Sequence, residues 1–174
     1  MVFVKPEIYT TYFSALKNIN MNDYYIFKIC RKYINADNVI SWPQLFPTAE
    51  MVEKMKSGEM TEKEYTSLYF KKLSRIHPAT MITQMKGYAA GGILSSYGND
   101  WEKQPDFTDW VEKPFLLVCL ETPEKFCHRH LIAEWLKAND YKVEELKVSS
   151  NNGISLEDTS DNIITDYFSG GLEI

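Results

Sequence analysis

Five residues with reactive side chains lie within one eleven-residue segment of the chain. They are two thiols, a carboxylate, an imidazole and a guanidinium: Cys119, Glu121, Cys127, His128 and Arg129. The apolar run 115–119 predicts a buried strand, and the spacing of apolar residues in 130–136 predicts an amphipathic helix. Open α/β folds bind ligands at such strand–loop–helix corners. The sequence therefore predicts a functional site at this corner.

The chemistry of this corner depends first on Cys127, which falls at or just before the predicted helix N-terminus. The partial positive charge of a helix N-terminus lowers the pKa of a thiol, and His128 and Arg129 strengthen that effect. A thiolate here would be a nucleophile or a ligand. Glu121 follows Cys119 by two residues, so both side chains point to the same side of the sheet. We predict Cys127, Glu121 and His128 as catalytic residues, with Glu121 as general base or as acceptor for a ribose or base donor.

Each residue of the corner also has a purely structural interpretation. Cys119 ends an apolar strand, where a cysteine often serves as a small core residue. His128 suits helix capping or packing. Arg129 suits binding of a phosphate or carboxylate, but equally an ion pair with Glu121 or Glu124.

A metal ion would compete for the same side chains, since Cys119, Glu121, Cys127 and His128 offer thiolate, carboxylate and imidazole ligands. However, Cys-x7-Cys-His is not the spacing of a zinc finger or ribbon. Adjacent residues such as Cys127 and His128 also rarely point at one ion. No phosphate-binding Walker loop, Gly-x-Gly-x-x-Gly or Gly-x-Ser-x-Gly motif is present. We therefore expect no metal and no cofactor.

The composition is that of a folded, acidic protein. Its 174 residues are 44% hydrophobic and 14% aromatic, enough for one domain with a real core. The net charge of −5 argues against general binding to a nucleic-acid backbone. No apolar run reaches the roughly 18 residues that span a membrane, and the N-terminus lacks a signal peptide. The sequence thus predicts a cytoplasmic protein, of bacterial or phage origin, that does not associate with membranes.

The corner must be positioned by a small number of strands. Three other segments are rich in β-branched and aromatic residues and predict strands, the last of them an edge strand: 7–13, 24–30 and 141–146. The segment 38–47 predicts no long regular element, because Pro43 and Pro47 interrupt it.

Helical signals separate these strands. The expected helices run from the N-cap Thr48 to Gly58, from the capping box at Thr61 through Leu73, and over 79–85 and 128–138. Residues 86–110 contain glycines among aromatic residues and predict an irregular insertion, and 149–174 predict an acidic tail. The expected fold is a single Rossmann-like α/β domain over 1–148, with a mostly parallel sheet of four to five strands and helices on both faces.

The corner resembles the signature of the domain-of-unknown-function family 488, in which a strand ending in Cys-x-Glu is followed by Cys-His-Arg at a helix start. Weaker similarity extends over residues 7–146. The resemblance implies a compact α/β domain with its site at this corner, and it carries over Cys119, Glu121, Cys127, His128 and Arg129. Arg31 resembles the arginine of the family's Ser-x-Arg segment, although Cys30 stands near the usual serine.

The resemblance favours a nucleotide-like substrate, because the family is discussed alongside nucleotide- and DNA-processing systems. Our leading hypothesis is an enzyme, a hydrolase or transferase, acting on a nucleotide- or nucleoside-like small molecule or a modified base. Its ligand-binding residues would be Arg129 and Arg31 for the anionic part, aromatic residues that stack on the base, and nearby polar groups: Tyr9, Tyr12 and Trp42, with Thr10 and Cys119. The alternatives are a protein that sequesters a nucleotide signal and an inhibitor of a partner protein. The oligomeric state stays open.

Overall fold

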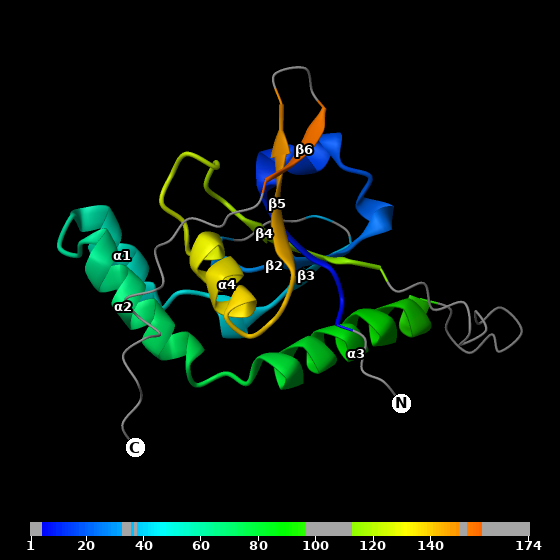
Figure 1. Cartoon of the computed structure of the whole chain (residues 1–174), viewed down its shortest axis with the longest axis horizontal. Helices are drawn as coiled ribbons and strands as arrows, with labels where there is room; N and C mark the ends of the chain where they lie inside the picture. The colour runs from blue at the N-terminus through cyan, green and yellow to red at the C-terminus, as the bar shows by residue number, and fades with distance from the viewer. Residues whose placement is uncertain (1–4, 33–35, 37, 97–112, 150–152, 158–174) are drawn as a thin grey trace, which may run out of the picture.

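A six-stranded, mostly parallel sheet forms the centre of the protein (Figure 1). The computed structural model describes residues 5–32, 36, 38–96, 113–149 and 153–157. The strands are β1 (Ile8–Tyr12), β2 (Tyr25–Lys28), β3 (Val39–Ser41), β4 (Phe115–Cys119), β5 (Val143–Val148) and β6 (Ile154–Glu157). Their order in the sheet is β3-β2-β4-β1-β5-β6. All neighbouring pairs are parallel except β5 and β6.

Strand β4 lies in the middle of the parallel part and positions the end of the predicted corner. Its five residues are all buried, as expected of a strand covered on both faces. The register pairs Cys119 with Tyr12 of β1 and Val118 with Lys28 of β2. Cys119 is therefore held at the carboxyl edge of the sheet.

The helices begin and end where the sequence predicts, with one exception. They are α1 (Ala49–Ser57), α2 (Glu62–Leu73), α3 (Pro78–Ser96) and α4 (His128–Lys137), with short 3-10 helices η1 (Phe13–Asn18), η2 (Met21–Asp23) and η3 (Pro43–Leu45). The Thr48 hydroxyl caps α1, Gly58 ends it with φ 77°, and the capping box between Thr61 and Glu64 is formed. The exception is α3, whose prediction ends at residue 85.

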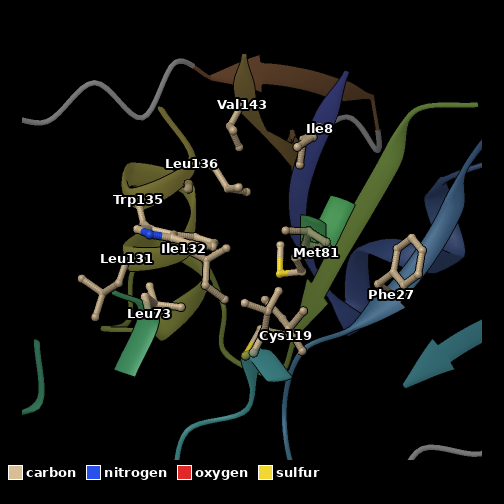
Figure 2. Packing of buried hydrophobic residues seen from close by; sticks show 14 of the residues in the cluster. Ile8, Phe27, Leu73, Met81, Cys119, Leu131, Ile132, Trp135, Leu136 and Val143 are labelled. Atoms are coloured by element: carbon tan, nitrogen blue, oxygen red, sulfur yellow. The ribbon is translucent and has the colours of Figure 1, made fainter. Parts of the chain in front are cut away.

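The α-helices cover one face of the sheet, where their apolar sides form the main core (Figure 2). Trp135, Ile132 and Leu136 of α4 meet Ile8 and Val143 of the sheet there, and α2 and α3 contribute side chains such as those of Leu73 and Met81. The other face packs against residues of η1 and of the segment up to η2. In the part of the chain that the structure describes, the helices predicted on both faces are thus α-helices on one face and, on the other, the 3-10 helices that link β1 to β2.

Three details of the predicted architecture need correction. The sheet has six strands rather than four to five, since β3 fits just ahead of Pro43 and β6 forms within the predicted tail. Strand β5 is not an edge strand, because β6 pairs with it from Glu145–Glu157 to Val148–Ile154. The first part of the predicted irregular insertion, 86–96, is helical. Its glycines lower helix stability by about 1 kcal/mol each but do not end a helix. The rest of the insertion and residues 158–174 of the tail lie outside the described residues.

Candidate functional site

A pocket of about 620 Å³ opens at the carboxyl ends of β2 and β4. All three cysteines of the chain and one histidine line it: Cys30, Cys119, Cys127 and His128. These four residues are buried, with 1–7% of their surface exposed, so they form the floor of the pocket. The corner predicted from the sequence is therefore a concave site, at the edge where parallel sheets bind ligands.

The local structure explains how residues distant in sequence reach this floor. Cys119 is the last residue of β4, and Cys127 is the N-cap of α4, in an extended conformation with φ −150°. Between them a turn closed by the Lys125 amide and the Thr122 carbonyl, 3.2 Å apart, brings the chain back over the strand end. Cys30 comes two residues after β2, the neighbour of β4.

His128 is oriented by a backbone group from another strand end. Its Nε2 lies 2.7 Å from the carbonyl oxygen of Ile29. A carbonyl can only accept, so Nε2 carries the proton and donates it. The Cys119 sulfur lies 3.8 Å from Nδ1 and 3.7 Å from Nε2 of the same ring. The ligand atoms of Cys119, Cys127 and His128 all lie within 4.8 Å of one another.

Hydrogen bonds among the three thiols shift their pKa values in opposite directions. Hydrogen bonds that Cys119 shares with Cys127 and Cys30 raise its pKa, as does its burial. The same hydrogen bond from Cys119 lowers the pKa of Cys127 well below the usual value, and His128 and Arg129 add to this against the effect of burial. The Cys30 pKa falls to about 7, chiefly through its hydrogen bond with Cys119. Of the three thiols, Cys119 thus holds its proton most tightly and Cys127 loses its proton most readily.

The mouth of the pocket is basic. Arg31, Lys32 and Lys56 line it and are exposed. Glu121 is the acidic residue of the lining; its side chain is 39% exposed, and its carboxylate lies 3.7 Å from the Lys125 amine. Three cations against one carboxylate make the mouth attractive to an anion.

The wall of the pocket is apolar and aromatic, with Val52 and Met55 of α1, Tyr65 of α2 and Phe126 before α4. The rings of Tyr65 and Phe126 meet edge to face at 5.3 Å. Burial raises the Tyr65 pKa, so its phenol stays neutral. Sequence reasoning missed these wall residues, together with Lys32 and Lys56. Phe126 directly precedes Cys127, so its position next to the motif could have identified it. Nothing in the sequence, however, indicates that the apolar side of α1 faces the site.

Arg129 does not line the pocket but is fully buried beside β5. Its Nε and Nη2 lie 2.9 and 2.8 Å from Oε1 of Glu145, and Nη1 donates to the backbone carbonyl of Glu121. Burial would raise the Glu145 pKa, but the hydrogen bond from His130 and the charge of Arg129 outweigh it and lower the pKa. An ion pair was one of the two predicted roles of Arg129, although its partner is Glu145 rather than Glu121 or Glu124.

The predicted stacking residues lie outside this pocket. Tyr9 packs edge to face on Tyr24 at 5.9 Å, and Trp42 packs on Phe27 at 5.8 Å. Tyr12 is buried under the guanidinium of Arg129. The buried Thr10 hydroxyl has no hydrogen-bond partner among the described residues. The structure therefore brings Cys119, Glu121, Cys127, His128 and Arg31 together, but not these four.

None of the helices in the described ranges is long and apolar enough to span a membrane. No protein family, curated protein or solved structure that was compared with this chain matches it.

Proposed function

We propose that the protein is an enzyme acting on a nucleotide- or nucleoside-like small molecule in the pocket at the carboxyl ends of β2 and β4. The observation that carries this proposal is the arrangement of the pocket, with reactive side chains on a buried floor below a basic mouth. Its volume lies within the roughly 300–1,000 Å³ of small-molecule sites. We also propose that the domain is Rossmann-like, because ligand binding at the carboxyl edge of the sheet is characteristic of that fold.

The mouth and the wall suit the two halves of a nucleotide. Arg31, Lys32 and Lys56 would bind the anionic half, with the arginine fork matched to phosphate oxygens. Tyr65 and Phe126 offer the ring surfaces on which a base packs. Tyr9, Tyr12 and Trp42, which the sequence predicts to stack on the base, lie outside the pocket. We therefore assign base stacking to Tyr65 and Phe126.

The floor would carry the chemistry. Cys127 and His128 lie at the start of α4, where the free backbone N–H groups of the first turn favour developing negative charge. Glu121 is the carboxylate in reach of a ligand in the pocket and would act as general base. Arg129 would act indirectly, because its Nη1 holds the Glu121 carbonyl. The three thiols are all free, which suits the reducing cytoplasm.

The test is mass spectrometry of a nucleotide-rich cell extract incubated with the wild type, Cys127→Ser or Glu121→Gln. A new small molecule that appears only with the wild type supports an enzyme. A metabolite depleted in proportion to protein and recovered intact on denaturation would show sequestration instead. No change in any metabolite would overturn both, and would direct attention to inhibition of a partner protein.

A matched pair of charge variants tests the mouth. Lys56→Gln removes a cation that lines the pocket, whereas Lys63→Gln removes an exposed cation of α2 that does not. We expect Lys56→Gln to weaken binding of a nucleoside monophosphate by about 1 kcal/mol, roughly fivefold. Lys63→Gln should leave it unchanged. Equal effects of the two variants on calorimetric affinity would contradict a localised anion site.

A further inference from the structure

Three side chains on the floor of the pocket bring sulfur and nitrogen atoms of the kinds that bind metals close together. The ligand atoms of Cys119, Cys127 and His128 lie within 4.8 Å of one another, on three buried side chains. In a tetrahedral zinc site, bonds of about 2.3 Å to sulfur and 2.0 Å to nitrogen place a sulfur and a nitrogen about 3.5 Å apart. Cys119 Sγ lies 3.8 Å from Nδ1 of His128 and 3.7 Å from Nε2 of the same ring.

A second observation is the orientation of His128. Its Nε2 donates to the Ile29 carbonyl, which leaves Nδ1 as the nitrogen available to a metal. Histidines that bind metals almost always donate their other nitrogen to a carbonyl or carboxylate in this way. The hydrogen bond also joins the end of β2 to the start of α4, so that the ligands are fixed on rigid elements before a metal arrives.

Charge balance allows the ion to be buried. Two thiolates would neutralise a divalent cation, and the positive end of α4 favours the Cys127 thiolate at its N-cap. A neutral cluster escapes most of the free-energy cost of burying an isolated charge. Two sulfurs and one imidazole are ligands that favour zinc over magnesium or calcium.

We propose that Cys119, Cys127 and His128 bind one zinc ion whose fourth coordination position faces the pocket. Three protein ligands with an open position are typical of catalytic zinc, whereas structural zinc has four. All three ligands line the pocket, so that position is accessible to a small molecule. Cys30 touches Cys119 but lies outside the set that converges on one point. The site goes beyond the proposed function and does not depend on the ligand being a nucleotide.

The test is the zinc content of the protein after dialysis against a mild chelator. We expect one zinc per chain in the wild type, and loss of zinc in Cys119→Ser, Cys127→Ser and His128→Gln. Two matched controls remove the remaining thiol and a neighbouring imidazole: Cys30→Ser and His130→Gln should keep the metal. A zinc-free wild type would overturn the proposal. Loss of zinc in Cys30→Ser would overturn the open position, because it would indicate a closed set of four ligands.

A measurement on the wild type alone tests the metal site even if the variants fail to fold. After its zinc has been removed with a strong chelator, titration of the wild type with Co²⁺ should give thiolate-to-cobalt charge-transfer bands and the strong visible bands of four-coordinate cobalt, saturating at one equivalent. Added azide should shift the visible bands if the fourth position is open. Absence of the charge-transfer bands would overturn the site, and insensitivity to azide would overturn the open position. A metal-loaded protein that alters no nucleotide would contradict only the proposed function.

Discussion

Two halves of one short motif lie in different environments. Cys127 and His128 line the pocket, where their side chains meet Cys119. The very next residue, Arg129, points into the protein and is paired with Glu145 of β5 at 2.8–2.9 Å. Three consecutive residues of a conspicuous motif therefore divide between a candidate reactive site and a buried structural ion pair.

The helix explains the division. Successive residues of an α-helix are rotated by about 100°, so adjacent side chains cannot all face the same cavity. Cys127 escapes this constraint because it is the N-cap, with an extended backbone, and can share the direction of His128. A reactive residue at a helix start can therefore be assigned to a site only if its position on the helix turns its side chain toward that site.

The sharpest way to test this division is to remove the guanidinium. Arg129→Met takes from buried Glu145 its buried cationic partner and leaves only the His130 imidazole beside it, which costs roughly 3–5 kcal/mol of unfolding free energy. Urea unfolding followed by circular dichroism measures the loss. The paired variant Arg129→Met with Glu145→Leu should recover most of it, because an apolar pair avoids desolvating two charges. A loss below about 1 kcal/mol in the single variant would show that the pair is not a structural element.

The sequence predicts the pocket site at Cys127 and His128 better than the buried ion pair of Arg129. The strand before Cys119, the helix after Cys127 and their convergence follow from apolar runs and from the periodicity of α4. The spacing argument against a metal does not anticipate that the ligand atoms of Cys119, Cys127 and His128 lie within 4.8 Å of one another. That convergence depends on the N-cap conformation and on the Ile29 carbonyl, neither of which a spacing reveals.

Partners distant in sequence were beyond prediction. Glu145 is 16 residues from Arg129, on a strand whose register alone decides that it faces α4. Glu121 and Glu124 were nearer in sequence and equally plausible by charge. Likewise, the prolines at 43 and 47 predict a break but not that Val39–Ser41 adds a strand beside β2, because strand pairing is a tertiary property.

Acid should weaken the buried ion pair between Arg129 and Glu145. The Glu145 pKa is lowered in the folded protein, so its contribution to stability is present above the unfolded value near 4.5 and is lost as pH falls through the folded pKa. The stability advantage of the wild type over Glu145→Gln should therefore be constant at neutral pH and shrink below about pH 4.5. Urea midpoints of both proteins across this range provide the measurement.

The His130 imidazole also faces Glu145, at 3.2 Å, and supplies the control. The same comparison made in a His130→Gln background separates the imidazole from the Arg129 ion pair. If the advantage over Glu145→Gln grows as the pH falls, the assigned direction of the Glu145 pKa shift is contradicted.

The buried Tyr69 hydroxyl, next to the floor of the pocket, is expected to affect the stability of the fold but not the metal site, and its effect on stability is smaller than that of Arg129. The Tyr69 ring packs edge to face on His128 at 5.5 Å, and its hydroxyl donates to the Leu45 carbonyl. Tyr69→Phe keeps the ring but leaves that buried carbonyl without a donor, which costs about 1–2 kcal/mol. Thermal unfolding should show the loss while the zinc content of the protein stays unchanged. Loss of zinc would mean that the hydroxyl, and not only the ring, positions His128.

The smallest expected effect on stability belongs to the residue with the largest expected effect on chemistry. In metal-free buffer, Cys127→Ser replaces one small buried side chain by another of similar size and should change the unfolding free energy by about 1 kcal/mol or less. The same variant should lose both the zinc and the turnover of the pocket. Urea unfolding, zinc analysis and mass spectrometry on one preparation measure all three quantities. A stability loss as large as that of Arg129→Met would contradict this assignment. It would show that the main role of the Cys127 thiol is to stabilise the fold, as the Arg129 ion pair does.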